Sequence, residues 1–83
     1  MDIYAELAQI LVDFGIDRGS VTTEARFRTD LDVDSTDLVA IGMAVEKRMP
    51  FPVDTTPFPA LESVAEMVAL IEEAYQSAVP EPR

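Results

Sequence analysis

Apolar residues recur at helical spacing in three stretches of the chain, and each stretch predicts a helix. The first covers residues 3–14. Its apolar side chains lie three or four positions apart and share one face: Ile3, Leu7, Ile10, Leu11 and Phe14. Asp2 can cap the start of this helix, and Gly15 lies where a left-handed residue commonly ends one.

The second predicted helix runs from Ser35 to about Met49, with Asp34 as its N-cap and Pro50 as its stop. One stripe of this helix is apolar and should face the core: Leu38, Ile41, Val45 and Met49. Gly42 inside the helix costs about 1 kcal/mol relative to Ala. That cost indicates either close packing at this position or a low need for rigidity, and the sequence leaves both open.

The last main helix is predicted from Ser63 to about Gln76. Ser63 and Glu66 have the spacing of a capping box. The apolar stripe of this helix consists of Val64, Met67, Val68, Ile71 and Tyr75. A short helical turn is predicted before it, because Pro57 is well tolerated at a first helical position and Phe58 and Leu61 can then face the core.

Residues 15–33 form a long connection between the first two helices. A connection of this length is uncommon unless it is functional or anchored, and Phe27 and Leu31 are the expected anchors. The predicted fold is therefore all-α, a small four-helix bundle with three main helices, one short helix and a long first loop. We expect one domain over residues 1–78 and a flexible tail over residues 79–83.

Composition excludes several classes of function. With 16 acidic and 6 basic residues the formal charge is −10, which disfavours a nucleic acid partner and suits docking on basic protein surfaces. The chain has no Cys and no His, so it lacks disulfides, thiolate metal ligands and the commonest general base. Its longest apolar run, residues 38–45, is far shorter than the roughly 20 residues of a membrane span. We expect no signal peptide, no membrane partner and a cytoplasmic protein.

Four carboxylates surround one serine in the most distinctive segment, residues 30–37. Asp30, Asp32 and Asp34 match the first, third and fifth positions of a calcium-binding EF-hand loop. However, Ser35 replaces the glycine that makes the turn of such a loop, and Ile41 replaces its bidentate glutamate. A calcium site is therefore disfavoured, and we expect no metal ligands.

Ser35 is also a poor candidate for an autonomous nucleophile. Lys47 is the only lysine, and it lies about three turns further along the same predicted helix, so it cannot act as the base. Neighbouring carboxylates disfavour an alkoxide. On local grounds alone, a purely structural interpretation stays open, in which Asp34 is a cap and Asp37 interacts with the helix dipole.

The sequence Asp30-Leu31-Asp32-Val33-Asp34-Ser35 resembles the modification site of acyl carrier proteins, where the pattern is typically Asp-Leu-Gly-x-Asp-Ser-Leu. The resemblance extends over roughly residues 3–76. It includes the first helix, the loop with Phe27, the serine at the start of the second helix and the last helix, all in the order of that family.

The resemblance implies that Ser35 receives a covalent 4′-phosphopantetheine arm from coenzyme A, with Asp34 as a flanking motif residue. A separate phosphopantetheinyl transferase would perform this reaction with Mg²⁺. The thiol of the arm would hold acyl cargo as a thioester, so the protein would be a carrier and not an enzyme. Expected partners are the transferase and the acyl-loading, synthase and tailoring enzymes, with the carrier itself a monomer.

A docking face follows from the spacing on the second helix. Ser35, Val39 and Met43 lie on one stripe, so Val39 and Met43 are expected to be exposed beside the arm. The polar or small residues around them are Thr36, Asp37, Ala40 and Lys47. The alternative is that this helix is more deeply buried and that both apolar residues belong to the core.

Two departures from the family pattern affect the functional prediction. Thr36 replaces the usual leucine after the serine, and Asp32 replaces the usual glycine, although Asp tolerates a left-handed conformation well. Basic and small residues also dilute the acidity of the second helix, which favours a carrier of polyketide or other specialised biosynthesis. A peptidyl or aminoacyl carrier, or a carrier of fatty acid synthesis, remains an alternative. The rival of another class is a calcium-responsive or protein-interaction module.

The core could also hold the cargo. In the family the acyl chain can enter between the helices, and the candidate lining here is Phe27, Leu38, Ile41, Val45, Val53, Leu61, Val68 and Ile71. Ordinary core packing explains the same residues equally well.

Overall fold

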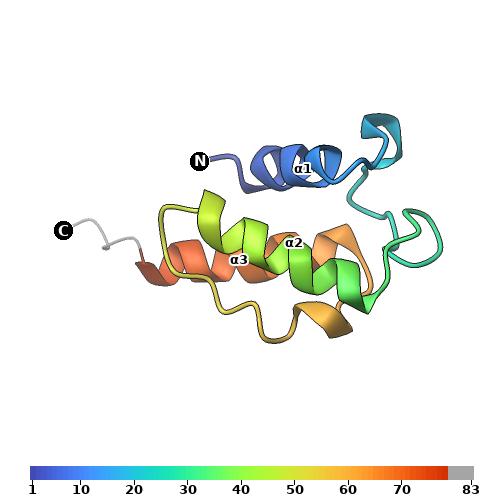
Figure 1. Cartoon of the computed structure of the whole chain (residues 1–83). Coiled ribbons are helices and arrows are strands. Elements are labelled where there is room, and N and C mark those ends of the chain that lie inside the picture. The colour runs from blue at the N-terminus through green and yellow to red at the C-terminus, as the bar shows by residue number, and fades with distance from the viewer. Residues whose placement is uncertain (79–83) are drawn as a thin grey trace.

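Three α-helices account for most of the fold in the computed structural model, which is described here for residues 1–78. They are α1 (Ile3–Asp13), α2 (Ser35–Arg48) and α3 (Val64–Ala78), with the short 3₁₀ helices η1 (Arg18–Ser20) and η2 (Phe58–Ala60) in the connections. Figure 1 shows the three helices running along one another, with the loop from α1 to α2 at one end of the bundle. The all-α prediction is confirmed. The predicted flexible tail, residues 79–83, lies outside the described residues.

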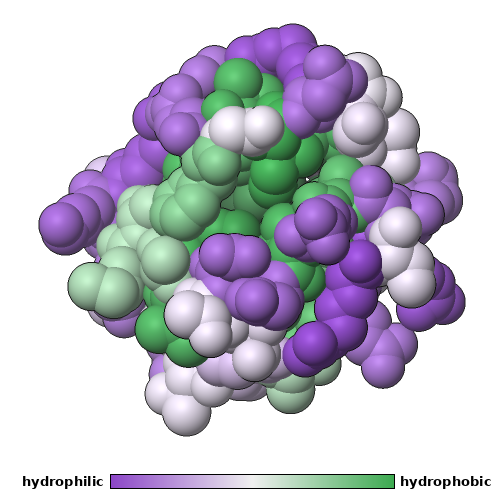
Figure 2. Space-filling view, turned by 45° about the vertical axis from the view of Figure 1, so that its right-hand side comes forward, coloured by the Kyte–Doolittle hydropathy of each residue, from purple (hydrophilic) through white to green (hydrophobic). Residues whose placement is uncertain are grey.

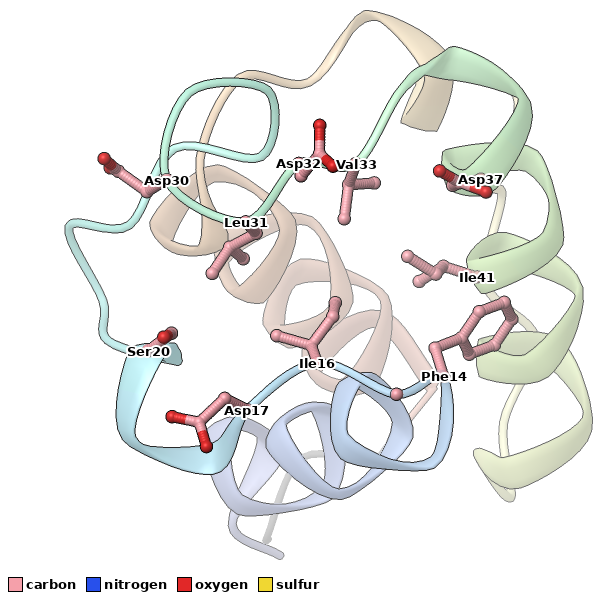
Figure 3. Close-up of a pocket in the computed structure, with 11 residues that line it drawn as sticks. Phe14, Ile16, Asp17, Ser20, Asp30, Leu31, Asp32, Val33, Asp37 and Ile41 are labelled. Carbon is pink, nitrogen blue, oxygen red and sulfur yellow. The ribbon is translucent and has the colours of Figure 1, made fainter.

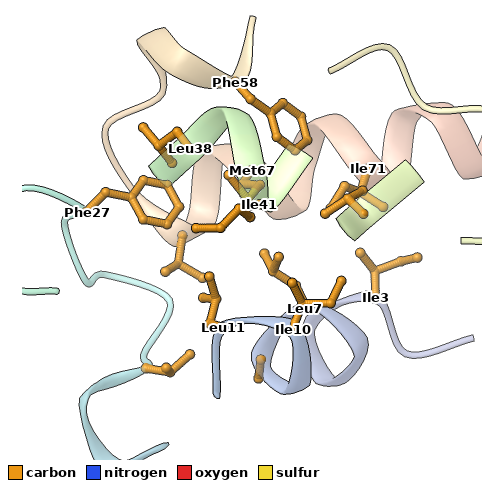
Figure 4. Packing of buried hydrophobic residues seen from close by; sticks show 14 of the residues in the cluster. Ile3, Leu7, Ile10, Leu11, Phe27, Leu38, Ile41, Phe58, Met67 and Ile71 are labelled. Carbon is orange, nitrogen blue, oxygen red and sulfur yellow. The ribbon is translucent and has the colours of Figure 1, made fainter. Parts of the chain in front are cut away.

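The core consists of apolar side chains from α1, α2, α3 and η2 and from the two long connections (Figure 4). The largest fully buried side chains are Phe27, Phe58, Leu7, Leu11, Leu38, Ile41, Met67, Ile71, Val45 and Val64. Among residues 1–78 no polar or charged residue is buried. Burial of apolar surface therefore supplies the main stabilisation, at about 25 cal/mol per Å².

The ends of α1 follow the sequence prediction closely, with one exception. The Asp2 side chain accepts a hydrogen bond from the Ala5 N–H at 3.1 Å, and Gly15 has a left-handed φ of 94°. The prediction was wrong for Phe14, whose side chain is 43% exposed. The helix ends at Asp13 and the chain turns at Gly15, so Ile16 packs against the core in place of Phe14.

The connection from α1 to α2 is anchored as expected, because Phe27 is fully buried and Leu31 is 8% exposed. It also forms hydrogen bonds to the start of α3, which the sequence pattern did not indicate. The N–H groups of Val64 and Ala65 donate to carbonyls of this connection, at Ala25 and Thr23, each at 3.0 Å. The connection thus satisfies donors at the start of α3 that have no partner inside the helix.

The predicted capping box of α3 is only half formed. The Ser63 hydroxyl accepts from the Glu66 N–H at 3.3 Å. The Glu66 carboxylate accepts from the N–H of Glu62 at 2.6 Å, one residue before the position that a capping box requires.

Gly42 lies where α2 packs closely against the segment that holds η2. A β-carbon built at Gly42 would lie 3.1 Å from the Thr55 Cβ and 3.4 Å from the Phe58 Cδ2. Close packing, one of the two explanations left open by the sequence, is therefore the observed one. The short helix starts one residue later than predicted, with Pro57 as its N-cap, and Leu61 is only half-buried.

The turn before η2 is held by Asp54 and Thr56. Hydrogen bonds from the side chain and then the backbone of Thr56 lower the pKa of the exposed Asp54 carboxyl. The backbone N–H of Thr56 donates to the Asp54 Oδ1 at 3.0 Å, which closes a local turn.

Candidate functional site

Ser35 is the first residue of α2, and its side chain is exposed. Asp34 and Asp37 fix the helix start on either side of it. The Asp34 carboxylate accepts from the Asp37 N–H at 2.9 Å, and the Asp37 carboxylate accepts from the Asp34 N–H at 3.2 Å. This reciprocal capping box fixes the backbone at Ser35, whose side chain is exposed to solvent.

The capping box leaves two donors at the tip of the helix. The N–H of Asp37 is bonded to Asp34, and the N–H of Leu38 donates to the Asp34 carbonyl at 3.0 Å. Of the first four N–H groups of α2, those of Ser35 and Thr36 therefore remain for an acceptor outside the helix. Such donors, together with the helix dipole, favour a phosphate group at this end.

Asp32 makes the turn that delivers the chain to this helix start. Its φ is 55°, the only positive value at a non-glycine position within residues 1–78. We expected Asp32 to tolerate a left-handed conformation at a position where the resembling sequence pattern has glycine, and the structure confirms it. Val33 then returns to the core, with its N–H donating to the Phe27 carbonyl at 2.7 Å.

The outer face of α2 is apolar and exposed. Val39 is 50% and Met43 is 56% exposed, whereas Leu38, Ile41 and Val45 are fully buried. The two stripes predicted from the spacing are therefore separate, and deep burial of the whole helix is contradicted.

Val39 and Met43 line a shallow hollow of about 480 Å³ together with Ser35, Thr36, Ala40 and Pro59. Ser35 thus shares this hollow with four of the six residues proposed as a docking face, namely Thr36, Val39, Ala40 and Met43. Sequence reasoning missed Pro59. Its contribution depends on how η2 packs beside α2, and the spacing within α2 carries no signal for that contact.

The other two residues of the predicted docking face do not line this hollow. Asp37 lines a different hollow, which it shares with Ile41 and the loop after α1 (Figure 3). Lys47 is exposed in the last turn of α2, outside the hollow that contains Ser35.

The acidic side chains around Ser35 do not form a cation site in the part of the chain that the structure describes. Residues 1–78 contain no group of three or more acidic side chains arranged to hold a metal ion. Asp34 and Asp37 are engaged with each other's backbone, and Asp30 accepts from the Arg26 N–H at 2.8 Å.

The predicted cargo lining is packed core. Six of its eight members are buried, and Ile41 alone lines one of the hollows described for residues 1–78.

Comparison with known proteins identifies the family. No protein-family profile matches the chain. An acyl carrier protein of Akkermansia muciniphila is 38% identical over 72 residues, which cover 86% of this chain and 90% of that protein. This chain belongs to the acyl carrier protein family. Acyl carrier proteins of Petrotoga mobilis (30% identical) and Rhodococcus erythropolis (34%) each match 87% of the chain, and cover 86% and 80% of their own lengths.

Membership of this family makes the chain an acyl carrier and not an enzyme, one that interacts with synthase and modifying enzymes. It also agrees with the observed architecture of three helices, without β-strands among residues 1–78. None of the described helices combines the length and the apolar character needed to span a membrane.

Proposed function

We propose that this acyl carrier protein transports acyl intermediates as thioesters on a 4′-phosphopantetheine arm attached to the Ser35 hydroxyl. The observation that carries the proposal is the position of that hydroxyl. It is exposed, it is the first residue of α2, and it follows the sequence Asp30-Leu31-Asp32-Val33-Asp34. Residues 1–78 would act as one carrier domain.

The residues at the start of α2 fit a phosphodiester on Ser35. The N–H groups of Ser35 and Thr36 can donate to its oxygens, and the helix dipole favours its negative charge. The carboxylates of Asp34 and Asp37 repel the same charge at short range, so the arm should project away from the helix. When bound, the arm supplies the thiol that this chain lacks, since the sequence contains no Cys.

Attachment at Ser35 depends on a separate transferase. Lys47 lies twelve residues along α2, about 18 Å at 1.5 Å per residue, and the chain contains no His. The chain therefore offers neither a histidine nor a nearby lysine as a base, and the flanking carboxylates of Asp34 and Asp37 accept backbone N–H groups, which supports activation by the partner enzyme.

Partner enzymes would dock on the outer face of α2. Val39 and Met43 expose apolar surface in the hollow that contains Ser35, so contact there would bring the arm to the partner's active site. Thr36 and Ala40 complete this surface, with Lys47 at its far end.

The pathway that we propose is polyketide or other specialised biosynthesis. The support is the composition of the outer face of α2, which carries small, apolar and basic residues at positions 39, 40, 43 and 47. A carrier of fatty acid synthesis commonly presents an acidic face there, and Thr36 in place of leucine is a further departure.

Intact mass spectrometry tests the attachment directly. The purified chain is incubated with coenzyme A, Mg²⁺ and a phosphopantetheinyl transferase of broad specificity. We expect the mass to rise by one phosphopantetheine group in the wild type and in Ser77→Ala, and to stay unchanged in Ser35→Ala. Ser77→Ala is the matched control, because it removes an exposed serine hydroxyl from α3, outside the hollow at Ser35.

Two results would overturn the proposal. One is an unmodified wild-type chain under conditions in which another carrier protein is loaded. The other is a Ser35→Ala variant that still gains the group. Circular dichroism of Ser35→Ala excludes a trivial loss of folding.

A further inference from the structure

The four methionines of this chain differ in exposure. Met49 and Met67 are buried in the core, whereas Met1 and Met43 are 57% and 56% exposed. Figure 2 shows hydrophobic residues exposed between hydrophilic ones on one face of the molecule. Peroxide oxidises Met and Cys side chains most readily, and the chain has no Cys, so the folded structure leaves two thioethers open to oxidation.

One of these two exposed thioethers lies in the hollow at Ser35. Met43 lines this hollow, eight residues or about 12 Å along α2 from Ser35, whereas Met1 does not line it. The remaining lining consists of Thr36, Val39, Ala40 and Pro59. Among the described residues, the lining of this hollow therefore includes no charged side chain, and its side-chain donors are two hydroxyls at one end.

A methionine suits a surface that several partner enzymes contact in turn. Its unbranched thioether adapts to neighbours of different shape, and methionine is frequent at surfaces that bind many partners. A leucine would expose a similar apolar surface without the sulfur. The weakness of methionine is chemical, because peroxide converts the apolar thioether into a polar sulfoxide.

We propose that Met43 is an oxidation site, and that its conversion to the sulfoxide weakens the docking of partner enzymes on the outer face of α2. Hydrogen peroxide supplies the oxygen atom. The sulfur gives up two electrons and forms one S–O bond, the O–O bond of the peroxide breaks, and water leaves. The Ser35 hydroxyl is not changed by this reaction.

The sulfoxide oxygen finds no hydrogen-bond donor in the lining of the hollow. The hydroxyls of Ser35 and Thr36 belong to residues about 12 and 10 Å away along α2. Lys47, one turn further along α2, is exposed outside the hollow. A docked partner would therefore bury a polar group in apolar surroundings, which disfavours the complex.

The inference rests on the proposed function in requiring partners that dock beside Ser35. The two can fail separately. Loading of the untreated chain tests attachment at Ser35, whereas the present test compares the oxidised chain with the untreated chain.

The test begins with the purified full-length chain, treated with hydrogen peroxide and then with catalase to remove the excess. Mass spectrometry of proteolytic fragments measures sulfoxide formation at each methionine over time. We expect Met1 and Met43 to be oxidised at least about tenfold faster than Met49 and Met67, because only the first two are exposed. Circular dichroism of the oxidised chain should be unchanged for the same reason.

Steady-state loading by a phosphopantetheinyl transferase of broad specificity then measures docking. We expect oxidation to raise the KM for this chain by about threefold to tenfold and to leave kcat within about twofold, because apolar contact is lost while the Ser35 hydroxyl is unchanged. Treatment with both methionine sulfoxide reductases and dithiothreitol should restore the KM.

Met43→Leu is the matched control, because it removes the sulfur from the hollow and keeps Met1. Each protein is compared with its own untreated sample, and the KM of Met43→Leu should not respond to peroxide.

Four outcomes would overturn the inference. Met43 could be oxidised no faster than Met67, or the KM could stay unchanged although Met43 is oxidised. The KM of Met43→Leu could rise as much as that of the wild type. Oxidation could also reduce the helix content, which would make weaker docking a consequence of unfolding.

Discussion

At the scale of single residues, two aspartates determine how Ser35 is presented. Asp32 adopts a φ of 55° that few side chains accept, and Asp34 exchanges hydrogen bonds with Asp37 across the first turn of α2. Both roles were predictable, because the tolerance of Asp for left-handed backbone and its capping preference are local properties. The contribution of Pro59 to the hollow at Ser35 was not, because it depends on a contact between separate segments.

Two substitutions of Asp34 distinguish the contribution of its hydrogen bond to stability from the contribution of its charge. Asp34→Ala should lower the free energy of unfolding by about 1 kcal/mol, because it removes the acceptor for the Asp37 N–H. Asp34→Asn keeps an acceptor and should change stability by less than about 0.5 kcal/mol. Urea unfolding followed by circular dichroism measures both. A loss in Asp34→Asn as large as that in Asp34→Ala would contradict the capping role.

The same pair of variants bears on loading. If the Asp34 carboxylate helps the transferase to place its Mg²⁺, Asp34→Asn should be loaded more slowly although it folds normally. An unchanged initial rate of loading, measured by intact mass, would leave Asp34 with a structural role only.

At the scale of elements, the three main helices were predictable because each buries one regular apolar stripe. The loop after α1 was harder, since its buried residues have no period: Val21, Ala25, Phe27, Leu31 and Val33. Its short helix η1 and its hydrogen bonds to the start of α3 went unpredicted for the same reason. Phe14 was misplaced because the stripe continued one residue beyond the end of α1.

The two stripes of α2 can be compared by truncation. Ile41→Ala should lower the free energy of unfolding by about 2–5 kcal/mol, because it opens a cavity beneath a fully buried side chain. Val39→Ala, on the half-exposed outer stripe, should cost about 1 kcal/mol or less. Urea unfolding of both variants tests the assignment. Similar losses would mean that the outer stripe is also packed.

Gly42 offers a test of the contact between α2 and the segment of η2. Ala is a better helix former by about 1 kcal/mol, but its β-carbon would lie 3.1 Å from the Thr55 Cβ, and overpacking typically costs about 1–3 kcal/mol. We therefore expect Gly42→Ala to be less stable than the wild type in thermal unfolding. A more stable variant would show that the two segments separate easily.

At the scale of the whole molecule, the negative charge is unevenly distributed. Seven of the 16 acidic residues lie between positions 13 and 37, around the loop end of the bundle, whereas the outer stripe of α2 carries Val39, Ala40, Met43 and Lys47. Two ion pairs are formed among the described residues, Arg26 with Glu62 and Arg48 with Glu6. Exposed pairs of this kind contribute little, so repulsion among like charges should dominate the electrostatics of folding.

Salt should therefore stabilise this protein. Raising NaCl from 10 mM to 500 mM at pH 7 screens the repulsion and should increase the free energy of unfolding, on the order of 1 kcal/mol. Near pH 4, where Asp and Glu titrate, the gain should shrink. Thermal unfolding at both salt concentrations and both pH values measures the effect. Destabilisation by NaCl at pH 7 would contradict this account.

The central claim is that one hydroxyl, at the start of α2, is the attachment point for the arm. Proteolysis of the loaded chain followed by fragmentation mass spectrometry locates the added group on a single residue. We predict that the group lies on Ser35 and that all other hydroxyl residues are unmodified. A fully loaded chain with the group on any other residue would contradict the account.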